Sequence, residues 1–320
     1  MDKRQAGRRP FAGLGPILGM LIVTVLVLAG CGSTTGSLNP APSKFANDSS
    51  PSAPAISLTP SPTPLPSATA ALPKATLTLL PTAVSCDEIT GEMVSATLES
   101  EILGKVYPFE VYLPPCYDPK NPIGYPVTYL LHGLRADQTQ WEEIGVLAEA
   151  DRMILAQEVS PFMVVMPLIP DLNSYPSELN GQVILGELVP YIDGHYATQA
   201  DAAHRAIGGL SRGAVWALRL AGSDWDVFGK VGLHSSALDD WEIGQWVAAL
   251  KALPAEERPQ LYLDSGVEDP DLSCGVKLEA ALTKANIPHL WNMFAGSHDM
   301  AYWKAHLAIY LEWYTQGWDS

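Results

Sequence analysis

Three short stretches of the chain contain residue types that together could perform nucleophilic acyl chemistry. Ser211 lies in GGLSRG, Asp269 lies in GVEDPD, and His298 lies in GSHD. A serine hydroxyl is a poor nucleophile unless a histidine takes its proton, and a carboxylate must orient that histidine and stabilise its charged form. We therefore predict Ser211 as the nucleophile, Asp269 as the acid and His298 as the base.

The surroundings of Ser211 fit a sharp turn between a strand and a helix. Gly209 and Gly213 stand two residues before and two residues after it, where such a turn brings flanking backbone into contact. The five-residue pattern alone is weak, and Ser211 could instead only cap the following helix. The two roles are compatible, because a helix amino terminus also stabilises negative charge developing beside it.

Other residues compete for the roles of acid and base. Asp271 and Glu268 share the acidic loop with Asp269, and Asp264 is less well placed because it lies within a predicted strand. His298 is the histidine in the loop that the order serine, acid, histidine requires. We expect structural roles for His195, His204, His289 and His306.

The stretch PVTYLLHGLR, which ends at residue 135, predicts donors for an oxyanion. A buried strand runs into a glycine turn there, so the backbone N–H of Leu134 could point into the site beside that of Arg212. The same residues could form a simple turn. Trp141 could form a wall of the substrate pocket or anchor the next helix, and Tyr175 and Trp241 could bind substrate or belong to the core.

Alternating apolar strands and longer helical segments must position these residues. The predicted strands are 93–100, 105–114, 126–131, 162–167, 205–210, 230–235, 260–265 and 289–294, and the predicted helices are 141–157, 181–196, 212–222, 240–252, 275–285 and 300–316. This pattern predicts an α/β fold with a mostly parallel central sheet, antiparallel strands at its start and helices on both faces. Chemistry in such sheets sits at the carboxyl ends of the strands.

The first 85 residues differ from the rest. Residues 1–31 combine basic residues, an apolar run and the sequence LAGC, which indicates a lipoprotein-type signal peptide with Cys31 as the lipidated residue. An uncleaved membrane anchor is the alternative. Residues 32–85 contain ten of the 27 prolines and predict a disordered linker. Residues 86–320 form the predicted folded domain, which either reading places outside the cytoplasm on a bacterial membrane.

Charge and cysteine content narrow the possible partners. Residues 1–30 hold four basic residues and one acidic residue; the remainder has 15 Lys and Arg against 34 Asp and Glu, a net charge of −19. Such a surface disfavours nucleic acid. The spacing of Cys and His predicts no metal site, and we expect no cofactor. Beyond Cys31, we expect one disulfide, Cys86–Cys116, and one free thiol; three free buried cysteines are the alternative.

Several motifs in a fixed order resemble one family. LPPCYD, YPVTYLLHG, ELVPYID, RAIGGLSRGAVWALRLA, GVED and GSHDMAYW together resemble the Putative esterase family, which groups feruloyl esterases, S-formylglutathione hydrolases, enterochelin esterase domains and mycolyltransferases. The resemblance spans roughly residues 90 to 316. Ala214 departs from the family pattern, which usually has a third glycine there, and Gly222–Trp225 replaces a commoner histidine-proline turn.

The resemblance implies an α/β-hydrolase fold and the same assignment of roles, with Ser211, Asp269 and His298 as the triad and the amides of Leu134 and Arg212 as the oxyanion hole. It implies a serine esterase acting on a small-molecule or polysaccharide-linked ester. Acyl transfer of the mycolyltransferase type is the alternative within the fold. A non-catalytic surface-binding module is the alternative from another class. The oligomeric state and the identity of the acyl group are not predicted.

Overall fold

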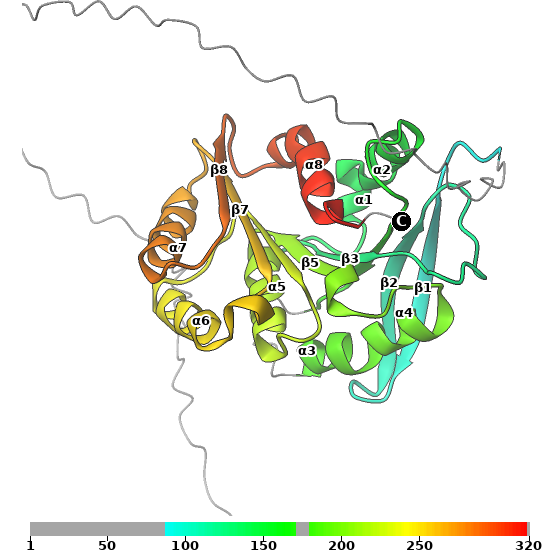
Figure 1. Cartoon of the computed structure of the whole chain (residues 1–320), viewed down its shortest axis with the longest axis horizontal. Coiled ribbons are helices and arrows are strands. Elements are labelled where there is room, and N and C mark those ends of the chain that lie inside the picture. The colour runs from blue at the N-terminus through cyan, green and yellow to red at the C-terminus, as the bar shows by residue number, and fades with distance from the viewer. Residues whose placement is uncertain (1–86, 171–178, 319–320) are drawn as a thin grey trace, which may run out of the picture.

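The computed structural model describes residues 87–170 and 179–318 of the 320-residue chain. One sheet of eight strands forms its centre (Figure 1). The strands are β1 Glu92–Ser100, β2 Lys105–Leu113, β3 Val127–Leu131, β4 Met163–Pro167, β5 Arg205–Leu210, β6 Lys230–His234, β7 Gln260–Gly266 and β8 Leu290–Phe294. Strands β3 to β6 are buried along their whole length, as continuous apolar runs in a parallel sheet should be.

The strand order is β1-β2-β4-β3-β5-β6-β7-β8. Strand β1 pairs with β2 and β2 with β4 in antiparallel fashion, and all later pairs are parallel. The predicted mostly parallel sheet with an antiparallel start is therefore confirmed. Because β5 to β8 are neighbours in register, the loops that follow them leave the same edge of the sheet side by side.

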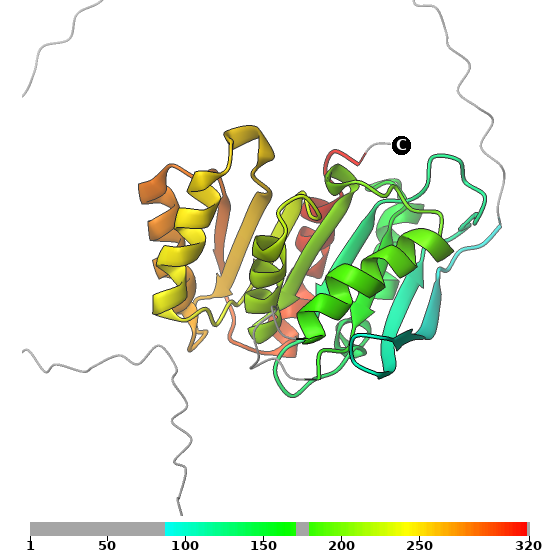
Figure 2. The ribbon, with the colours of Figure 1, turned by 90° about the horizontal axis from the view of Figure 1, so that it is seen from below.

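Helices cover both faces of the sheet (Figures 1 and 2). They are α1 Gln140–Ile144, α2 Val146–Leu155, α3 Leu179–Val183, α4 Val189–His195, α5 Arg212–Ser223, α6 Asp240–Ala252, α7 Leu272–Ala285 and α8 Met300–Thr315. Helices α1, α2 and α8 pack on one face, and α3 to α7 pack on the other. Each face has its own cluster of buried apolar side chains, so the sheet separates two cores.

Two predicted helices are interrupted. The predicted helix 141–157 divides at Gly145, whose φ of 108° ends α1 and lets its N–H bond to the last carbonyls of that helix. The predicted helix 181–196 consists of α3, a π-helical segment at Ile184–Leu188 and α4. In both places the apolar residues keep a helical spacing, but the backbone departs from a continuous α-helix.

The predicted signal peptide, Cys31, the linker and Cys86 lie outside the described residues. Cys116 and Cys274 are both disulfide-bonded, so the expectation of a free thiol is wrong for Cys274. The pairing of Cys116 with Cys86 stays a prediction. Within residues 87–170 and 179–318, every helix is too short or too polar to cross a bilayer.

Candidate active site

Ser211 lies on a strained turn between β5 and α5. Its φ of 54° and ψ of −117° are unusual for a residue with a side chain, and such strain is commonly stored at functional sites. The glycines around it allow this turn by close backbone approach. A Cβ on Gly209 would lie 2.4 Å from the carbonyl carbon of Gly213, and a Cβ on Gly213 would lie 2.3 Å from the carbonyl oxygen of His132. Both positions therefore require glycine.

His298 and Asp269 form a hydrogen-bonded pair beyond the ends of β8 and β7. The Nδ1 of His298 lies 3.0 Å from each carboxylate oxygen of Asp269. The Asp269 side chain is fully buried, while 21% of the His298 side chain is exposed. The structure thus joins two of the three predicted triad residues and leaves one edge of the imidazole open to the surface.

The two partners shift each other's pKa. Burial lowers the pKa of His298, but the hydrogen bond and charge of Asp269, with smaller contributions from nearby carboxylates, outweigh it, so the pKa is raised. Burial raises the pKa of Asp269, and its hydrogen bonds, led by the one to His298, outweigh that effect, so the pKa is lowered. The pair therefore holds a carboxylate beside the imidazole and stabilises a protonated imidazole.

Asp271 supports this pair through its backbone. Its N–H donates to Asp269 Oδ1 at 2.7 Å, and burial raises the pKa of its own carboxyl. Asp269, Asp271 and His298 also offer ligand atoms within 4.8 Å of one another, a group that could hold a metal ion. However, both oxygens of Asp269 already bond to His298, and we interpret the cluster as a hydrogen-bonded pair with a second carboxylate beside it.

The loop after β3 approaches the serine turn. A Cβ on Gly133 would lie 3.8 Å from the Cβ of Ser211. The N–H of Gly133 donates to Oε1 of Gln140 at 2.7 Å, which leaves the next amide, that of Leu134, as the candidate oxyanion donor in this loop. Arg212 is the first residue of α5, where helix N–H groups point out of the amino-terminal end.

His132 holds the base of this loop and was not singled out by the sequence analysis as a functional residue. Its Nε2 accepts a hydrogen bond from the N–H of Ile169 at 2.9 Å, so its Nδ1 carries the proton and donates to the carbonyl of Gly133. Burial lowers the pKa of His132, which keeps the ring neutral. His132 therefore connects the loops that follow β3 and β4 at the carboxyl edge of the sheet.

Backbone contacts bring Ser211 to the same edge as the His298 pair. The N–H of Ser211 donates to the carbonyl of His234, the last residue of β6, and the N–H of Ser235 donates to the carbonyl of Asp264 in β7. Among the described residues, no hydrogen bond joins the Ser211 hydroxyl to His298 Nε2. Such contacts are often long without substrate and shorten in the reacting complex.

The aromatic residues considered for substrate binding differ in position. Trp141 is buried, and its Nε1–H donates to the carbonyl of Leu131 at 3.1 Å, so this candidate is a core residue and not a pocket wall. Tyr175 lies outside the described residues. Trp241 is 55% exposed at the start of α6, two residues after Asp239, whose carboxylate lies 4.0 Å from Arg212. Trp241 is therefore exposed on the segment whose Asp239 faces the guanidinium of Arg212, the residue after Ser211.

A second buried histidine–aspartate pair lies beneath the site. His234 Nδ1 is 2.7 Å from Asp264 Oδ1, and His234 Nε2 is 2.9 Å from the hydroxyl of Tyr314. Asp264 Oδ2 accepts hydrogen bonds from the hydroxyls of Tyr302 and Tyr310. The sequence contained no signal for this network beyond the aromatic residues of the last predicted helix, because its members come from three separate elements.

Comparison with known proteins identifies the family. The model of the family described as "Putative esterase" matches residues 100–314. The chain belongs to this family. Its fold is the α/β-hydrolase fold, as the eight-stranded, mostly parallel sheet and the similar solved structures show.

Similar proteins include several that are named feruloyl or ferulic acid esterases. A stretch of 157 residues is 32% identical to an endo-1,4-beta-xylanase/feruloyl esterase of Xylanibacter ruminicola. The match covers 45% of this chain and 22% of the relative, so the chain spans about a fifth of that protein's length. A ferulic acid esterase structure aligns with a TM-score of 0.64 at 24% identity, covering 71% of this chain and 99% of the other. The feruloyl esterase module from Clostridium thermocellum, solved as an S954A mutant with sinapinate, aligns with a TM-score of 0.62 at 19% identity, covering 74% and 92%.

Proposed function

We propose that this protein is a serine carboxylic-ester hydrolase that acts through an acyl-enzyme on Ser211. The observation that carries the proposal is the placement of a strained serine at the amino terminus of α5, on the same sheet edge as the His298–Asp269 pair. Membership of the Putative esterase family supports the same chemistry.

In the first half-reaction, the Ser211 hydroxyl attacks the ester carbonyl and His298 Nε2 takes the hydroxyl proton. Asp269 keeps the Nδ1 proton of His298 in place and stabilises the positive charge on the ring. The negative oxygen of the tetrahedral intermediate accepts hydrogen bonds from the N–H groups of Leu134 and Arg212. Collapse of the intermediate breaks the ester bond, and His298 gives its proton to the departing alcohol.

In the second half-reaction, water attacks the acyl group on Ser211 while His298 takes one of its protons. A second tetrahedral intermediate forms at the same oxyanion site. Its collapse releases the carboxylic acid and returns the proton to the Ser211 oxygen. The raised pKa of His298 favours the imidazolium that both half-reactions require, because Asp269 stabilises that charged form.

We propose esters of hydroxycinnamic acids, free or linked to polysaccharide, as the substrate class to test first. The named activity of the relatives supports this choice, since feruloyl esterases occur both among the sequence matches and among the solved structures. The exposed Trp241, two residues after the Asp239 that faces Arg212, offers an aromatic surface for such a ring.

A fluorophosphonate probe tests the reaction class. The folded protein should be labelled, and Ser211→Ala should remove the label and lower kcat on a model ester by at least about a thousandfold. Labelling that survives in Ser211→Ala would overturn the assignment of the nucleophile, and an unlabelled native protein would favour a binding module. A screen of acetyl, aryl and feruloyl esters, run with and without a sugar acceptor, then separates hydrolysis, which gives free acid, from acyl transfer, which gives a new ester.

We also propose that the protein is exported and tethered to the membrane through lipid on Cys31. The basic start, the apolar run and the LAGC sequence support this, and residues 32–85 would then separate the domain from the bilayer. Growth with radiolabelled palmitate should label the native chain, and Cys31→Ser should not be labelled. Equal labelling of both chains, or none of the native chain, would contradict the proposal.

A further inference from the structure

Trp303, in the first turns of α8, packs against the imidazole of His298. The two ring centroids lie 5.2 Å apart with an interplanar angle of 78°, an edge-to-face arrangement. Trp303 is only 5% exposed, so this contact lies at the inner side of the imidazole. The tryptophan follows the histidine by five residues, and the loop and helix start between them set the contact.

The indole of Trp303 is itself held by a hydrogen bond to Ser235. The Trp303 Nε1–H donates to Ser235 Oγ at 3.2 Å. Ser235 is fully buried at the end of β6 and has a φ of 50°, a left-handed conformation that a serine adopts only when its surroundings require it. Its hydroxyl also helps to lower the pKa of the Asp269 carboxyl, so the side chain of Ser235 lies beside both the predicted acid and the indole.

The backbone on both sides of His298 is already fixed. The carbonyl of Gly296 accepts a hydrogen bond from the N–H of Glu268 at 3.0 Å. After His298, the Asp299 side chain caps α8 by accepting from the N–H of Tyr302 at 2.9 Å. The remaining freedom of His298 is therefore rotation of its side chain, which the bond to Asp269 restricts at one nitrogen only.

We propose that Trp303 and Ser235 are positioning residues that keep the His298 ring aimed at Ser211. Trp303 blocks the inward swing of the imidazole, and Ser235 fixes the indole through its hydrogen bond and lies beside the carboxylate of Asp269. Neither residue touches the reacting atoms, so their loss should lower kcat and leave KM nearly unchanged. This inference rests on the proposed function, because it assigns partners to the proposed base.

Trp303→Phe tests the role of the indole, with Trp313→Phe as the matched control. Both tryptophans lie on α8 and both are nearly buried, but Trp313 packs against Tyr262 and Tyr314 and not against His298. We expect Trp303→Phe to lower kcat by about tenfold or more with KM within twofold, as expected for a small displacement of a catalytic group. Both variants should lower Tm by similar amounts, but kcat of Trp313→Phe should stay within twofold of the native value.

Ser235→Ala and Ser235→Gly test the hydroxyl separately from the backbone. Both remove Oγ, but glycine adopts a φ of 50° without strain. We expect both variants to lower kcat severalfold, whereas a purely conformational role would let glycine retain full activity. The proton resonance on His298 Nδ1 gives a readout besides activity, and it should broaden or disappear in Trp303→Phe and in both Ser235 variants.

The outcomes separate the two proposals. A native protein that hydrolyses no ester and takes no fluorophosphonate would overturn the proposed function and this inference with it. An active native protein whose Trp303→Phe variant keeps kcat within twofold and an unchanged Nδ1 resonance would overturn the inference alone. An equal loss of kcat in Trp313→Phe would also overturn it, because the effect would then come from general weakening of α8.

Discussion

Two histidine–aspartate pairs at the carboxyl side of this sheet have the same chemical groups and different surroundings. In the His234–Asp264 pair both side chains are fully buried, and the second ring nitrogen bonds to the Tyr314 hydroxyl. In the His298–Asp269 pair the imidazole is partly exposed, and no described side chain bonds to its Nε2. Only the second pair has a nitrogen that can exchange a proton with a substrate or nucleophile.

The difference shows that the burial of the side chains, and not their residue types, separates a structural pair from a candidate catalytic one. A buried pair must be fully hydrogen-bonded, because an unpaired polar group in the interior is costly. The glycines of β5 and β6 serve this requirement, since a Cβ on Gly208 or Gly232 would collide with the Tyr314 hydroxyl that bonds to His234. The first glycine of GGLSRG therefore makes room for the structural pair, and the second one makes room for the serine turn.

Replacing the aspartate of each pair should give the largest effects, a loss of activity in one variant and a loss of stability in the other. Asp269→Asn should lower kcat on a model ester by about a thousandfold or more, because the imidazole loses the partner that sets its tautomer and charge. Asp264→Asn should instead lower the free energy of unfolding by about 3–5 kcal/mol, because it leaves a buried network incomplete. Urea unfolding and kcat per folded molecule measure the two effects.

A milder variant covers the case in which Asp264→Asn does not fold. Tyr310→Phe removes one hydroxyl from Asp264 Oδ2 and should cost about 1 kcal/mol with kcat within twofold. The comparison of the two pairs fails if Asp264→Asn or Tyr310→Phe abolishes kcat in a protein of native stability.

The pH dependence of activity tests the His298–Asp269 pair directly, and we expect effects of intermediate size. The proposed mechanism requires neutral His298, so the raised pKa of this residue should place the acidic limb of kcat/KM above pH 6.5. Asp271→Asn removes a nearby negative charge that favours the imidazolium, and should therefore move this limb to lower pH. Glu268→Gln, in the same loop, is the matched control and should leave the limb in place. A limb that moves to higher pH in Asp271→Asn would contradict the assignment of His298 as the base.

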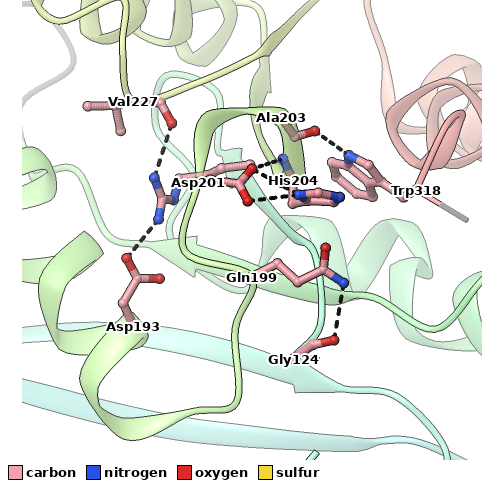
Figure 3. Close-up of polar contacts among 9 residues, drawn as sticks. Gly124, Asp193, Gln199, Asp201, Ala203, His204, Val227 and Trp318 are labelled. Carbon is pink, nitrogen blue, oxygen red and sulfur yellow. Dashed lines mark hydrogen bonds and ion pairs between the residues drawn. The ribbon is translucent and has the colours of Figure 1, made fainter. Parts of the chain in front are cut away.

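The smallest effects are expected at a third pair, on the surface (Figure 3). His204 Nδ1 lies 2.8 Å from Asp201, but both side chains are substantially exposed to solvent. His204→Ala should change the free energy of unfolding by less than about 0.5 kcal/mol. Asp201→Ala should cost about 1 kcal/mol, because its side chain also accepts the N–H of His204 at a short helix. Thermal melts and kcat should show that neither variant alters activity, and a large loss of activity would mean that the pair does more than the structure indicates.

The amino-acid sequence predicted the main architecture well. Alternation of apolar strands with amphipathic helices is a local property, and it located all eight strands and the helices that cross between them. It missed the break at Gly145 and the π-helical segment at Ile184–Leu188, because helical periodicity continues through both. The order in which strands neighbour one another follows from long-range pairing, which periodicity does not report.

The sequence by itself determined the chemical groups of the candidate site and the strand ends from which they come, since GGLSRG, GVEDPD and GSHD are local patterns with fixed spacing. Only the tertiary structure decided which histidine pairs with which aspartate, which tryptophan packs against His298, and how deeply each group is buried. The physical reason is that these properties depend on contacts between residues far apart in the sequence, such as His298 with Asp269, 29 positions apart, and His234 with Tyr314, 80 positions apart. Hydrogen-bond partners and solvent exposure are set by packing, and packing arises only when the strands and helices assemble.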